Sequence, residues 1–520
     1  MWIPAPTPLG SFPPFAFQAP AEGRFPVAST EAIPTEFSAL QSGIDPLKHR
    51  AASRIDEIFF GLLLLGIAAA PFWFGSNRPV AWGGNALYFG ALLVAYEGSL
   101  IFRGMAHPVA LKRLWLPALA FLAVVIWIGV QLSGFTPQSW HHPLWGMAAD
   151  ALGHDVEGRI TVNPQHTWEA GLRLLTAAAV FWLALQLCRN PWRASKFLQA
   201  VALIGFVYAG YGLIAHFLLP DRILWYPKLY YKESVTATFI NRNNAATYFG
   251  LALIACLGTI ISTYRRATAR VADNWRFQLG SAIETTAGWG GFLLVAFFTI
   301  GVALILTGSR AGIVSSLAGL MALSGLLLLG GRKHGRFAGL LVLAAAAVVV
   351  ATVLIYGDLF FDRLSRVNAA GRTAVYAITW QSVGDAPILG MGYGTFEDIF
   401  PMYRDTSMSP WDIWDKAHDT YLELLQGLGV PMAACLIGAV VFLVFLCLRG
   451  ATTRQRSGYL PAVAVAGSVL VGLHSFVDFS LQIQAVALTW IAILGAGVAQ
   501  SWSSRIETGD GLVGEALGRS

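Results

Sequence analysis

Charged residues are scarce in this chain. Asp, Glu, Lys and Arg make up 12% of its 520 residues, whereas 56% are hydrophobic, and the mean hydropathy is +0.58. A typical soluble domain has about a quarter of its residues charged, so this composition excludes that class. The chain instead offers repeated apolar runs near the roughly 20 residues that cross a bilayer. We therefore predict a polytopic α-helical membrane protein.

Cysteine is also scarce, with four residues in the whole chain. All four lie in or at the ends of apolar runs without metal-ligand or redox spacing, so neither a disulfide framework nor a zinc site is indicated. The net charge is +6, but the basic residues occur in short clusters between apolar segments, which is the arrangement that membrane topology produces. On that ground we exclude nucleic acid as a partner.

About twelve apolar segments are candidate transmembrane helices, so the expected fold class is an all-α membrane protein with a membrane domain over residues 48–500. The segments are 58–74, 86–102, 114–132, 172–187, 197–219, 245–264, 290–306, 311–329, 337–356, 424–448, 459–474 and 483–499. Residues 1–47 lack a basic region ahead of a sustained apolar core, so we expect a disordered cytoplasmic tail rather than a signal peptide. Residues 501–520 are expected to form a second cytoplasmic tail.

The distribution of Lys and Arg predicts the orientation of the chain. With the N-terminus inside, every second loop is cytoplasmic, and each of these loops is basic. Their basic residues are Arg103, Lys112 and Arg113; Arg189, Arg193 and Lys196; Arg265, Arg266, Arg270 and Arg276; Arg332, Lys333 and Arg336; and Arg449, Arg454 and Arg456. The alternate loops are sparser in basic residues for their length, and three of them are long: 133–168, 220–244 and 357–420. We expect these three outside, which is the periplasm of a Gram-negative cell.

The loop over residues 357–420, between the ninth and tenth predicted helices, is expected to carry the function. A membrane protein that keeps one long polar excursion usually keeps it for substrate. Within it, Arg372 precedes Tyr376 and Trp380, whose spacing fits a helix along the membrane surface with its aromatic side chains inward. Arg372 is a candidate phosphate contact; solvation of a polar helix face is the alternative.

Two further arginines lie on the same predicted side. Arg310 stands in the short turn 307–312, where its guanidinium would offer a fixed fork of donors to a lipid-borne phosphate. The alternative is an Arg that snorkels to the interface at a helix end. Arg242, in the run Asn241–Asn244, is a candidate third phosphate contact, and Asn244 a candidate substrate contact. N-capping by Asn is expected for that run whatever other role its residues have.

His418 is the candidate general base, because a neutral imidazole can accept a proton from a sugar hydroxyl. A structural hydrogen bond is the alternative. Asp419 and Glu423 are close enough in sequence to orient the imidazole or to cap the following helix, and Asp419 is a candidate substrate contact. Tyr393 is another, although the glycines over 390–394 most simply supply a tight turn.

Several other polar residues carry weaker signals. Glu97 lies in an apolar run without a visible partner, and Glu169 and Arg173 are spaced to pair with each other on a helix. For His474, Asp478 and Gln482 we expect capping and loop packing. The carboxylates Asp362, Asp385, Glu397 and Asp398 could bind a divalent ion, but their spacing does not require one. A mechanism without metal, assisted by arginine cations, is therefore expected.

In their order, these features resemble the O-antigen ligase and polysaccharide polymerase superfamily of polytopic membrane proteins. The resemblance spans residues 238–484, about half of the chain. It rests on Thr238 and Phe239 with Asn241–Asn244; Thr307–Ala311; Gly371 and Arg372 with Trp380; Gly390–Gly394; His418 and Asp419 with Tyr421, Leu422 and Glu423; and His474 with Asp478. One departure is Asp419, where an Asn is common in relatives.

The resemblance implies a glycosyltransferase of the bacterial inner membrane that moves a glycan from an undecaprenyl-diphosphate carrier to an acceptor hydroxyl on the periplasmic side. It implies that Arg310 and Arg372 neutralise the diphosphate leaving group and that His418 activates the acceptor. No cofactor is then required. The implied partners are the carrier-linked glycan, an acceptor that is lipid A core or a growing polysaccharide, and membrane lipids.

Ligation of O-antigen to lipid A core, in lipopolysaccharide biosynthesis, is the first interpretation by that resemblance. A polysaccharide polymerase and a protein O-glycosylation enzyme remain open, because no residue identifies the acceptor. The alternative from another class is a twelve-helix transporter. A transporter would be expected to show related halves and broken helices or charges near the middle of the membrane, whereas the polar groups here gather in the predicted external loops.

Overall fold

The computed structural model describes residues 46–268, 275–329, 365–406, 408–409, 411–454 and 458–502. The predicted ninth span, the start of the loop at 357–364, and most of the two predicted tails lie outside these ranges. The chain divides into two units, Met1–Asp56 and Glu57–Ser520. The following account concerns the second unit.

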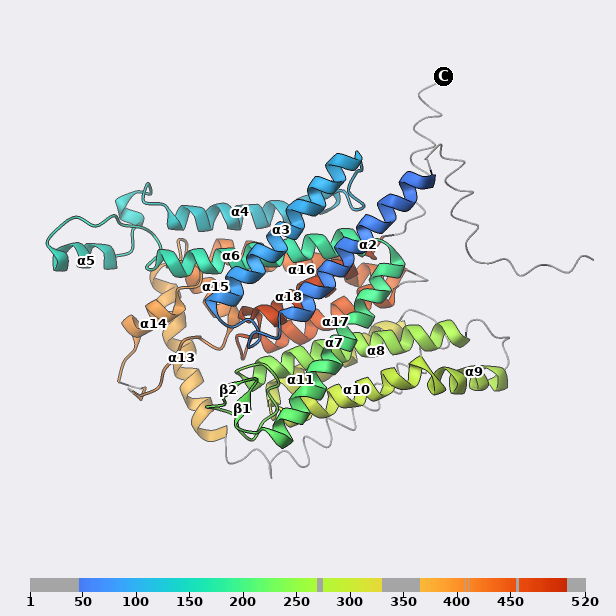
Figure 1. Ribbon diagram of the computed structural model, residues 1–520. Coiled ribbons are helices and arrows are strands. Elements are labelled where there is room, and N and C mark those ends of the chain that lie inside the picture. The colour runs from blue at the N-terminus through green and yellow to red at the C-terminus, as the bar shows by residue number, and fades with distance from the viewer. Residues whose placement is uncertain are drawn as a thin grey trace, which may run out of the picture. The chain divides into compact units, whose positions relative to one another are not determined.

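The described part of this unit is almost entirely helical (Figure 1). The α-helices are α2 (Pro46–Ala69), α3 (Pro79–Arg103), α4 (Trp115–Leu132), α5 (Leu144–Leu152), α6 (Pro164–Leu187), α7 (Pro191–Leu218), α8 (Arg242–Thr268), α9 (Trp275–Ala287), α10 (Trp289–Leu306), α11 (Arg310–Leu329), α13 (Ser365–Asp385), α14 (Phe396–Tyr403), α15 (Thr420–Leu428), α16 (Val430–Thr453), α17 (Tyr459–His474) and α18 (Gln484–Ala499). Three 3₁₀ turns, η1 (Leu111–Leu114), η2 (Gln138–Trp140) and η3 (Ser480–Gln482), and one small antiparallel hairpin, β1 (Arg222–Ile223) with β2 (Tyr226–Pro227), complete it.

Eight of the described helices are long and apolar enough to cross a membrane. They are α3, α4 with η1, α6, α7, α8, α10, α11 and α16. Helices α17 and α18 are also apolar but shorter, with 16 residues each. The prediction of a multi-pass helical membrane protein is therefore confirmed, whereas the number twelve stays a prediction.

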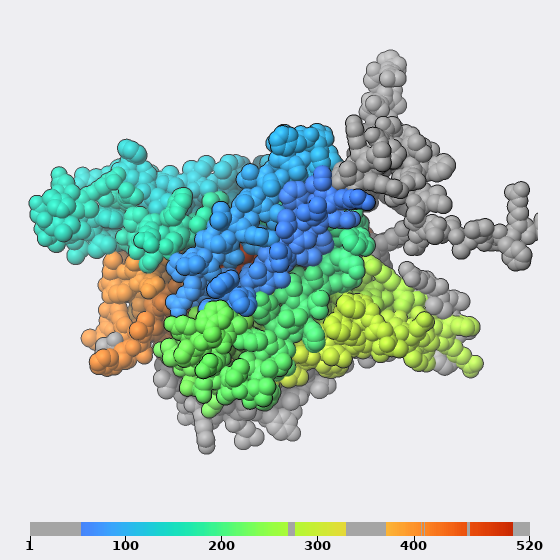
Figure 2. Space-filling model, viewed as in Figure 1, coloured from blue at the N-terminus to red at the C-terminus, as the bar shows by residue number. Residues whose placement is uncertain are grey.

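Helix α8 lies at the centre of the helix bundle. In its most apolar stretch, 94% of the residues are buried, and it packs against α7, α10, α11 and α17. Small residues permit this close packing: a Cβ added at Gly250 would lie 2.2 Å from the Ser316 hydroxyl oxygen. The C-terminal helices are similarly enclosed, and the face drawn in Figure 2 shows almost nothing of them. The polar groups at the ends of these helices are consequently held in a rigid frame.

One expected span, 424–448, is wrong at its start. The chain forms the short helix α15, breaks at Gly429 and begins α16 at Val430. Gly429 has a φ of +77°, which favours glycine, and Pro431 follows in the first turn of α16. The turn 390–394 packs against this break, with the Gly392 N–H donating to the Gly427 carbonyl at 3.1 Å. These glycines therefore supply close backbone contact as well as a turn.

Helix α13 forms where the long loop is expected to contain a helix, but its aromatic residues do not both face inward. Its buried face is made by Val375, Ile378 and Ser382, which share one side of the helix. Trp380 lies about 200° around the helix from Ile378 and is 62% exposed. The expectation of inward aromatics is thus wrong for Trp380, because apolar and small polar residues occupy the buried side.

Candidate active site

His418 stands in the turn that leads into α15. Its φ is +57°, a left-handed value that few residues other than glycine adopt. The Tyr376 hydroxyl donates to its carbonyl oxygen at 3.0 Å. The edges of Trp414 and Phe479 meet its ring, with centroid distances of 5.6 and 4.9 Å. Both the backbone and the imidazole are therefore positioned by neighbouring elements.

Asp478 is the carboxylate that faces this imidazole. Its Oδ1 atom lies 3.5 Å from His418 Nδ1, and the side chain is 1% exposed. Burial raises the pKa of the Asp478 carboxyl, but the imidazoles of His418 and His474 and the Phe479 N–H, which donates at 2.7 Å, outweigh it and hold the pKa below its usual value. An ionised Asp478 at Nδ1 leaves Nε2 of His418 as the nitrogen available to a substrate hydroxyl.

The carboxylates adjacent in sequence have other partners. Asp419 caps α15, where its Oδ1 accepts from the N–H groups of Tyr421 and Leu422 at 2.9 and 3.0 Å. Glu423 accepts from the Ala417 N–H at 2.7 Å. The expected capping is therefore observed, while the carboxylate at the imidazole comes from the loop between α17 and α18. The expectation of simple loop packing for Asp478 missed its pairing with His418, because the four-residue spacing from His474 signals only the contact between His474 and Asp478.

A buried network of polar side chains lies beside Asp478. His474 Nε2 lies 4.0 Å from Asp478 Oδ2, and its Nδ1 lies 3.0 Å from the Thr247 hydroxyl on α8. The Ser480 hydroxyl donates to Asn244 Oδ1 at 2.9 Å. Asn244 is 2% exposed, so its observed contact joins α8 to η3. Its role as a substrate contact stays a prediction.

The three predicted arginines converge on this region from three segments. Arg242 begins α8, Arg310 begins α11 and lies exposed, and Arg372 lies on α13. The charges of Arg372 and Arg310 both lie near enough to repel that of Arg242. Arg372 also donates to the Val477 carbonyl at 3.3 Å, one residue before Asp478. The arrangement concentrates positive charge beside His418, which suits an anionic ligand.

Tyr231 is a neighbour that the sequence did not indicate. The Arg242 guanidinium lies over its ring, 5.3 Å from the centroid. Burial raises the pKa of the Tyr231 hydroxyl, and the charges of Arg242 and Arg372 oppose this shift. Tyr231 precedes α8 in an irregular segment and has a φ of +58°. No periodicity or motif marks such a position.

The turn before Arg310 ties two helix starts together. Gly308 has a φ of +63°, and a Cβ added there would lie 3.5 Å from Arg242 Nη1. The Ser309 hydroxyl donates to Asn243 Oδ1 at 2.8 Å and accepts from the Gly312 N–H at 3.2 Å. The turn thereby fixes the starts of α8 and α11, and with them Arg242 and Arg310, at one end of the helix bundle.

Tyr393 lies apart from this cluster. Its N–H donates to Gln131 Oε1 at 3.2 Å, and its side chain lines a different pocket together with Arg173 and Glu423. The structure thus brings together His418 with the three arginines, but not Tyr393. Its role as a substrate contact remains a prediction.

Three of the other predicted carboxylates, Asp385, Asp398 and Glu97, contact particular side chains, whereas Asp362 lies outside the described residues. Asp385 accepts from the Tyr403 hydroxyl at 2.7 Å, and Asp398 lies 2.7 Å from His166 Nδ1. Glu97, which had no visible partner in the sequence, contacts His107 at 2.7 Å and the Trp182 indole N–H at 2.6 Å. Among the residues that the structure describes, no three His, Cys, Asp or Glu side chains form a group able to hold a metal ion.

Comparison with known proteins supports the resemblance seen in the motifs. Residues 295–437 match the family model described as O-Antigen ligase, and no curated protein matches the chain. The matched range includes Arg310, Arg372, Tyr393, His418 and Asp419, whereas Arg242, Asn244 and Asp478 lie outside it. Members of this family are glycosyltransferase-like enzymes that act on lipid-linked glycans. The protein is therefore a multi-pass membrane protein that carries a segment, residues 295–437, similar to the O-antigen ligase family.

Proposed function

We propose that the protein transfers a glycan from an undecaprenyl-diphosphate carrier to an acceptor hydroxyl, with His418 as the general base. The observation that carries the proposal is the imidazole of His418, held 3.5 Å from the buried carboxylate of Asp478 beside three arginines. A positioned base and a concentrated positive charge are the two features that this transfer needs. The family match supports glycosyl transfer in general.

The base step follows from the geometry of the imidazole. In this proposal the carboxylate of Asp478, 3.5 Å from Nδ1, favours the tautomer with Nε2 unprotonated, so that Nε2 can take the proton of the acceptor hydroxyl. The acceptor oxygen then forms a bond to the anomeric carbon while the bond from that carbon to the diphosphate oxygen breaks. The carboxylate of Asp478 stabilises the imidazolium that results.

The leaving group requires neutralisation, because negative charge builds on the diphosphate as its bond to the sugar breaks. Arg242, Arg310 and Arg372 present guanidinium groups from three different elements. A guanidinium remains charged at any physiological pH and matches phosphate oxygens with a planar fork of donors. In this proposal the arginines supply the electrostatic stabilisation of the transition state.

The proposed acceptor is lipid A core, and the proposed side is the periplasm of the bacterial inner membrane. The starts of α8 and α11 and the end of α17 lie together, because Ser309 bonds to Asn243 and His474 contacts Thr247. The basic loops at the other helix ends support a cytoplasmic location for those ends. Polymerisation of repeat units on the carrier is the second candidate, which the same base and arginines would serve.

The test is the glycan profile of a deletion strain complemented with wild type, His418→Ala or Arg372→Ala. Arg222→Ala, an exposed arginine of the β hairpin, is the matched control, and membrane abundance of each variant is measured by immunoblot. Ligation is supported if only wild type and the control restore long glycan on lipid A core while carrier-linked polymer persists in the site variants. Collapse of the carrier-linked polymer to single repeats identifies a polymerase. Full restoration by both site variants refutes the catalytic assignment.

A further inference from the structure

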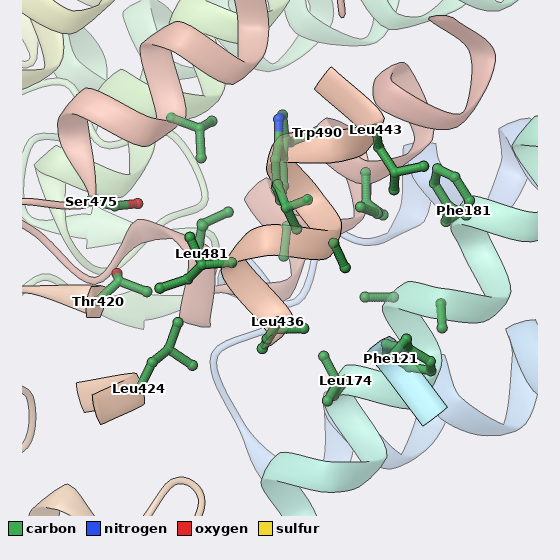
Figure 3. A pocket seen from close by; sticks show the side chains of 18 of the residues that line it. Phe121, Leu174, Phe181, Thr420, Leu424, Leu436, Leu443, Ser475, Leu481 and Trp490 are labelled. Carbon is green, nitrogen blue, oxygen red and sulfur yellow. The ribbon is translucent and has the colours of Figure 1, made fainter. Parts of the chain in front are cut away.

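A second polar cluster lies at one end of a large apolar pocket between α4, α6, α16, α17 and α18. The pocket has a volume of about 670 Å³, within the range of small-molecule sites. Figure 3 shows Phe121, Leu174, Phe181, Leu436, Leu443 and Trp490 around it. Its polar residues include Arg173, Tyr393, Glu423, Gln482 and Gln484. Such a shape suits a ligand with a long hydrocarbon part and a polar head.

Two buried donors at the polar end lack a hydrogen-bond acceptor. They are Arg173 Nε and Gln484 Nε2. Gln484 is 2% exposed, and its Oε1 is already used by Asn85 Nδ2 at 2.8 Å. Arg173 packs over the Trp82 ring at 4.3 Å, and its Nη1 lies 3.5 Å from the Gln482 carbonyl. An unpaired buried donor costs free energy, so both nitrogens favour a ligand that brings acceptor oxygens.

The donors at this end favour a ligand with acceptor oxygens, because the nearby carboxylate already has other partners. Burial raises the pKa of the Glu423 carboxyl, against the opposing effects of Lys416, the Ala417 N–H, Gln482 and His418. Both Glu423 oxygens are occupied, one by the Ala417 N–H at 2.7 Å and one by Gln482 Nε2 at 2.6 Å. The charges of Glu169 and Glu423 act on the Arg173 guanidinium, but its Nε donor has no acceptor, and phosphate is the best-matched partner of a guanidinium.

We propose that this pocket binds an anionic glycerophospholipid of the surrounding membrane, with its phosphate at Arg173 and Gln484 and one acyl chain among α4, α6 and α16. The choice of lipid rests on the proposed function, which places the carrier diphosphate at Arg242, Arg310 and Arg372. None of these arginines lines the pocket. One guanidinium with one amide fits a single phosphate group, and bulk phospholipid is the most abundant amphiphile beside the protein.

The pocket adjoins the turn that carries His418, the proposed base. Thr420 and Ser475 line it, and the Thr420 N–H donates to the Ser475 carbonyl at 2.8 Å. The Thr420 hydroxyl also donates to the Asp478 carbonyl at 3.1 Å. A bound lipid would therefore support the segments that position His418 and Asp478 without contacting the transferred sugar.

The test is native mass spectrometry of the detergent-purified full chain after addition of phosphatidylglycerol, phosphatidylethanolamine or undecaprenyl phosphate. Gln484→Glu keeps the acceptor for Asn85 but replaces the free donor with an oxygen that repels phosphate. Ala178→Phe fills the pocket, and Leu175→Phe, at a 45% exposed position of the same helix outside the pocket lining, is its matched control. Both pocket variants should lower the fraction of protein with bound phosphatidylglycerol by on the order of tenfold, whereas the control should not.

Equal phosphatidylglycerol binding by Gln484→Glu and wild type overturns the proposal, since it indicates lipid on the general surface only. A preference of the wild type for undecaprenyl phosphate, abolished by Gln484→Glu, overturns it in favour of the carrier. If Ala178→Phe does not fold, the charge variant alone decides. The readout is lipid binding, so the result can be interpreted even if the proposed transfer reaction fails. Arg372→Ala should retain the lipid whether or not it loses transfer.

Discussion

The contact between His418 and Asp478 predicts a large catalytic effect of Asp478→Asn. The two side chains approach to 3.5 Å, and Asp478 is buried. With an effective dielectric constant of about 20, a unit charge pair at this distance interacts by about 5 kcal/mol. That interaction stabilises the imidazolium formed during transfer, and each 1.36 kcal/mol is about tenfold in rate. We therefore expect kcat to fall by roughly a thousandfold, with KM for the carrier-linked donor nearly unchanged.

The assay is transfer of a carrier-linked glycan to the acceptor by purified protein in lipid vesicles. The chain offers a matched control, because His166 on α6 and Asp398 on α14 form a second His–Asp pair at 2.7 Å. Asp398→Asn removes a comparable contact and should leave kcat within about twofold. Thermal melting of each variant separates catalytic loss from unfolding. A folded Asp478→Asn variant with wild-type kcat would refute the pairing as part of the mechanism, as would an equal loss in both variants.

Three further predictions follow from particular contacts. Arg242→Ala should lower kcat/KM by on the order of a hundredfold. Arg242→Lys should recover part of this loss, because it restores the charge without the planar fork of donors or the contact with Tyr231. If Arg242→Ala has as little effect as the control Arg222→Ala, Arg242 does not belong to the site. Burial raises the pKa of Glu423 in the folded state, so its contribution to stability is present at pH below about 4.3 and is lost as pH rises through the folded pKa. The melting temperature of Glu423→Gln minus that of wild type should therefore be more positive at pH 8 than at pH 5. A pH-independent difference would contradict the pKa shift. Gly390→Ala places a Cβ 2.4 Å from the Gly427 carbonyl oxygen at a φ of +66° and should destabilise the protein by more than about 1–2 kcal/mol, whereas Gly384→Ala, with open space around it on α13, should not lower the melting temperature.

The helices were predictable because their cause is local. A run of apolar residues near bilayer length is helical in a membrane, because its backbone N–H and C=O groups find hydrogen-bond partners only within the segment. The expected segments at 459–474 and 483–499 match α17 and α18 within one residue. The start of α16 was not predictable from hydropathy, which continues without a break through Leu428 into Val430. What ends α15 is the backbone freedom of Gly429 and its packing against Ile388, a contact far away in sequence.

Single residues of the candidate site were predictable from the sequence, whereas the pairing of residues far apart in the chain was less so. His418 and the arginines are marked by charge in otherwise apolar surroundings. The partner of His418 comes instead from 60 residues further along the chain, and the neighbouring carboxylates offered a simpler alternative. Glu97 and Arg173 show the same limit. Glu97 contacts His107 and Trp182. Arg173 packs over Trp82, in addition to lying close enough to its predicted partner Glu169 for the two charges to interact.

The candidate site also extends beyond the matched family segment, and this bears on the proposed mechanism. The O-antigen ligase match ends at residue 437 and begins at 295, yet Arg242 precedes it and Asp478 follows it. Arg242 lies at the start of the most buried helix, and Asp478 lies in the turn between two enclosed helices. The matched segment contributes Arg310 at the start of α11, Arg372 on α13 and His418 in a turn. In the proposed mechanism, α8 and the turn between α17 and α18 supply one arginine and the carboxylate that stand beside the groups of the matched segment, and this fixed arrangement is the pre-organisation that electrostatic catalysis requires.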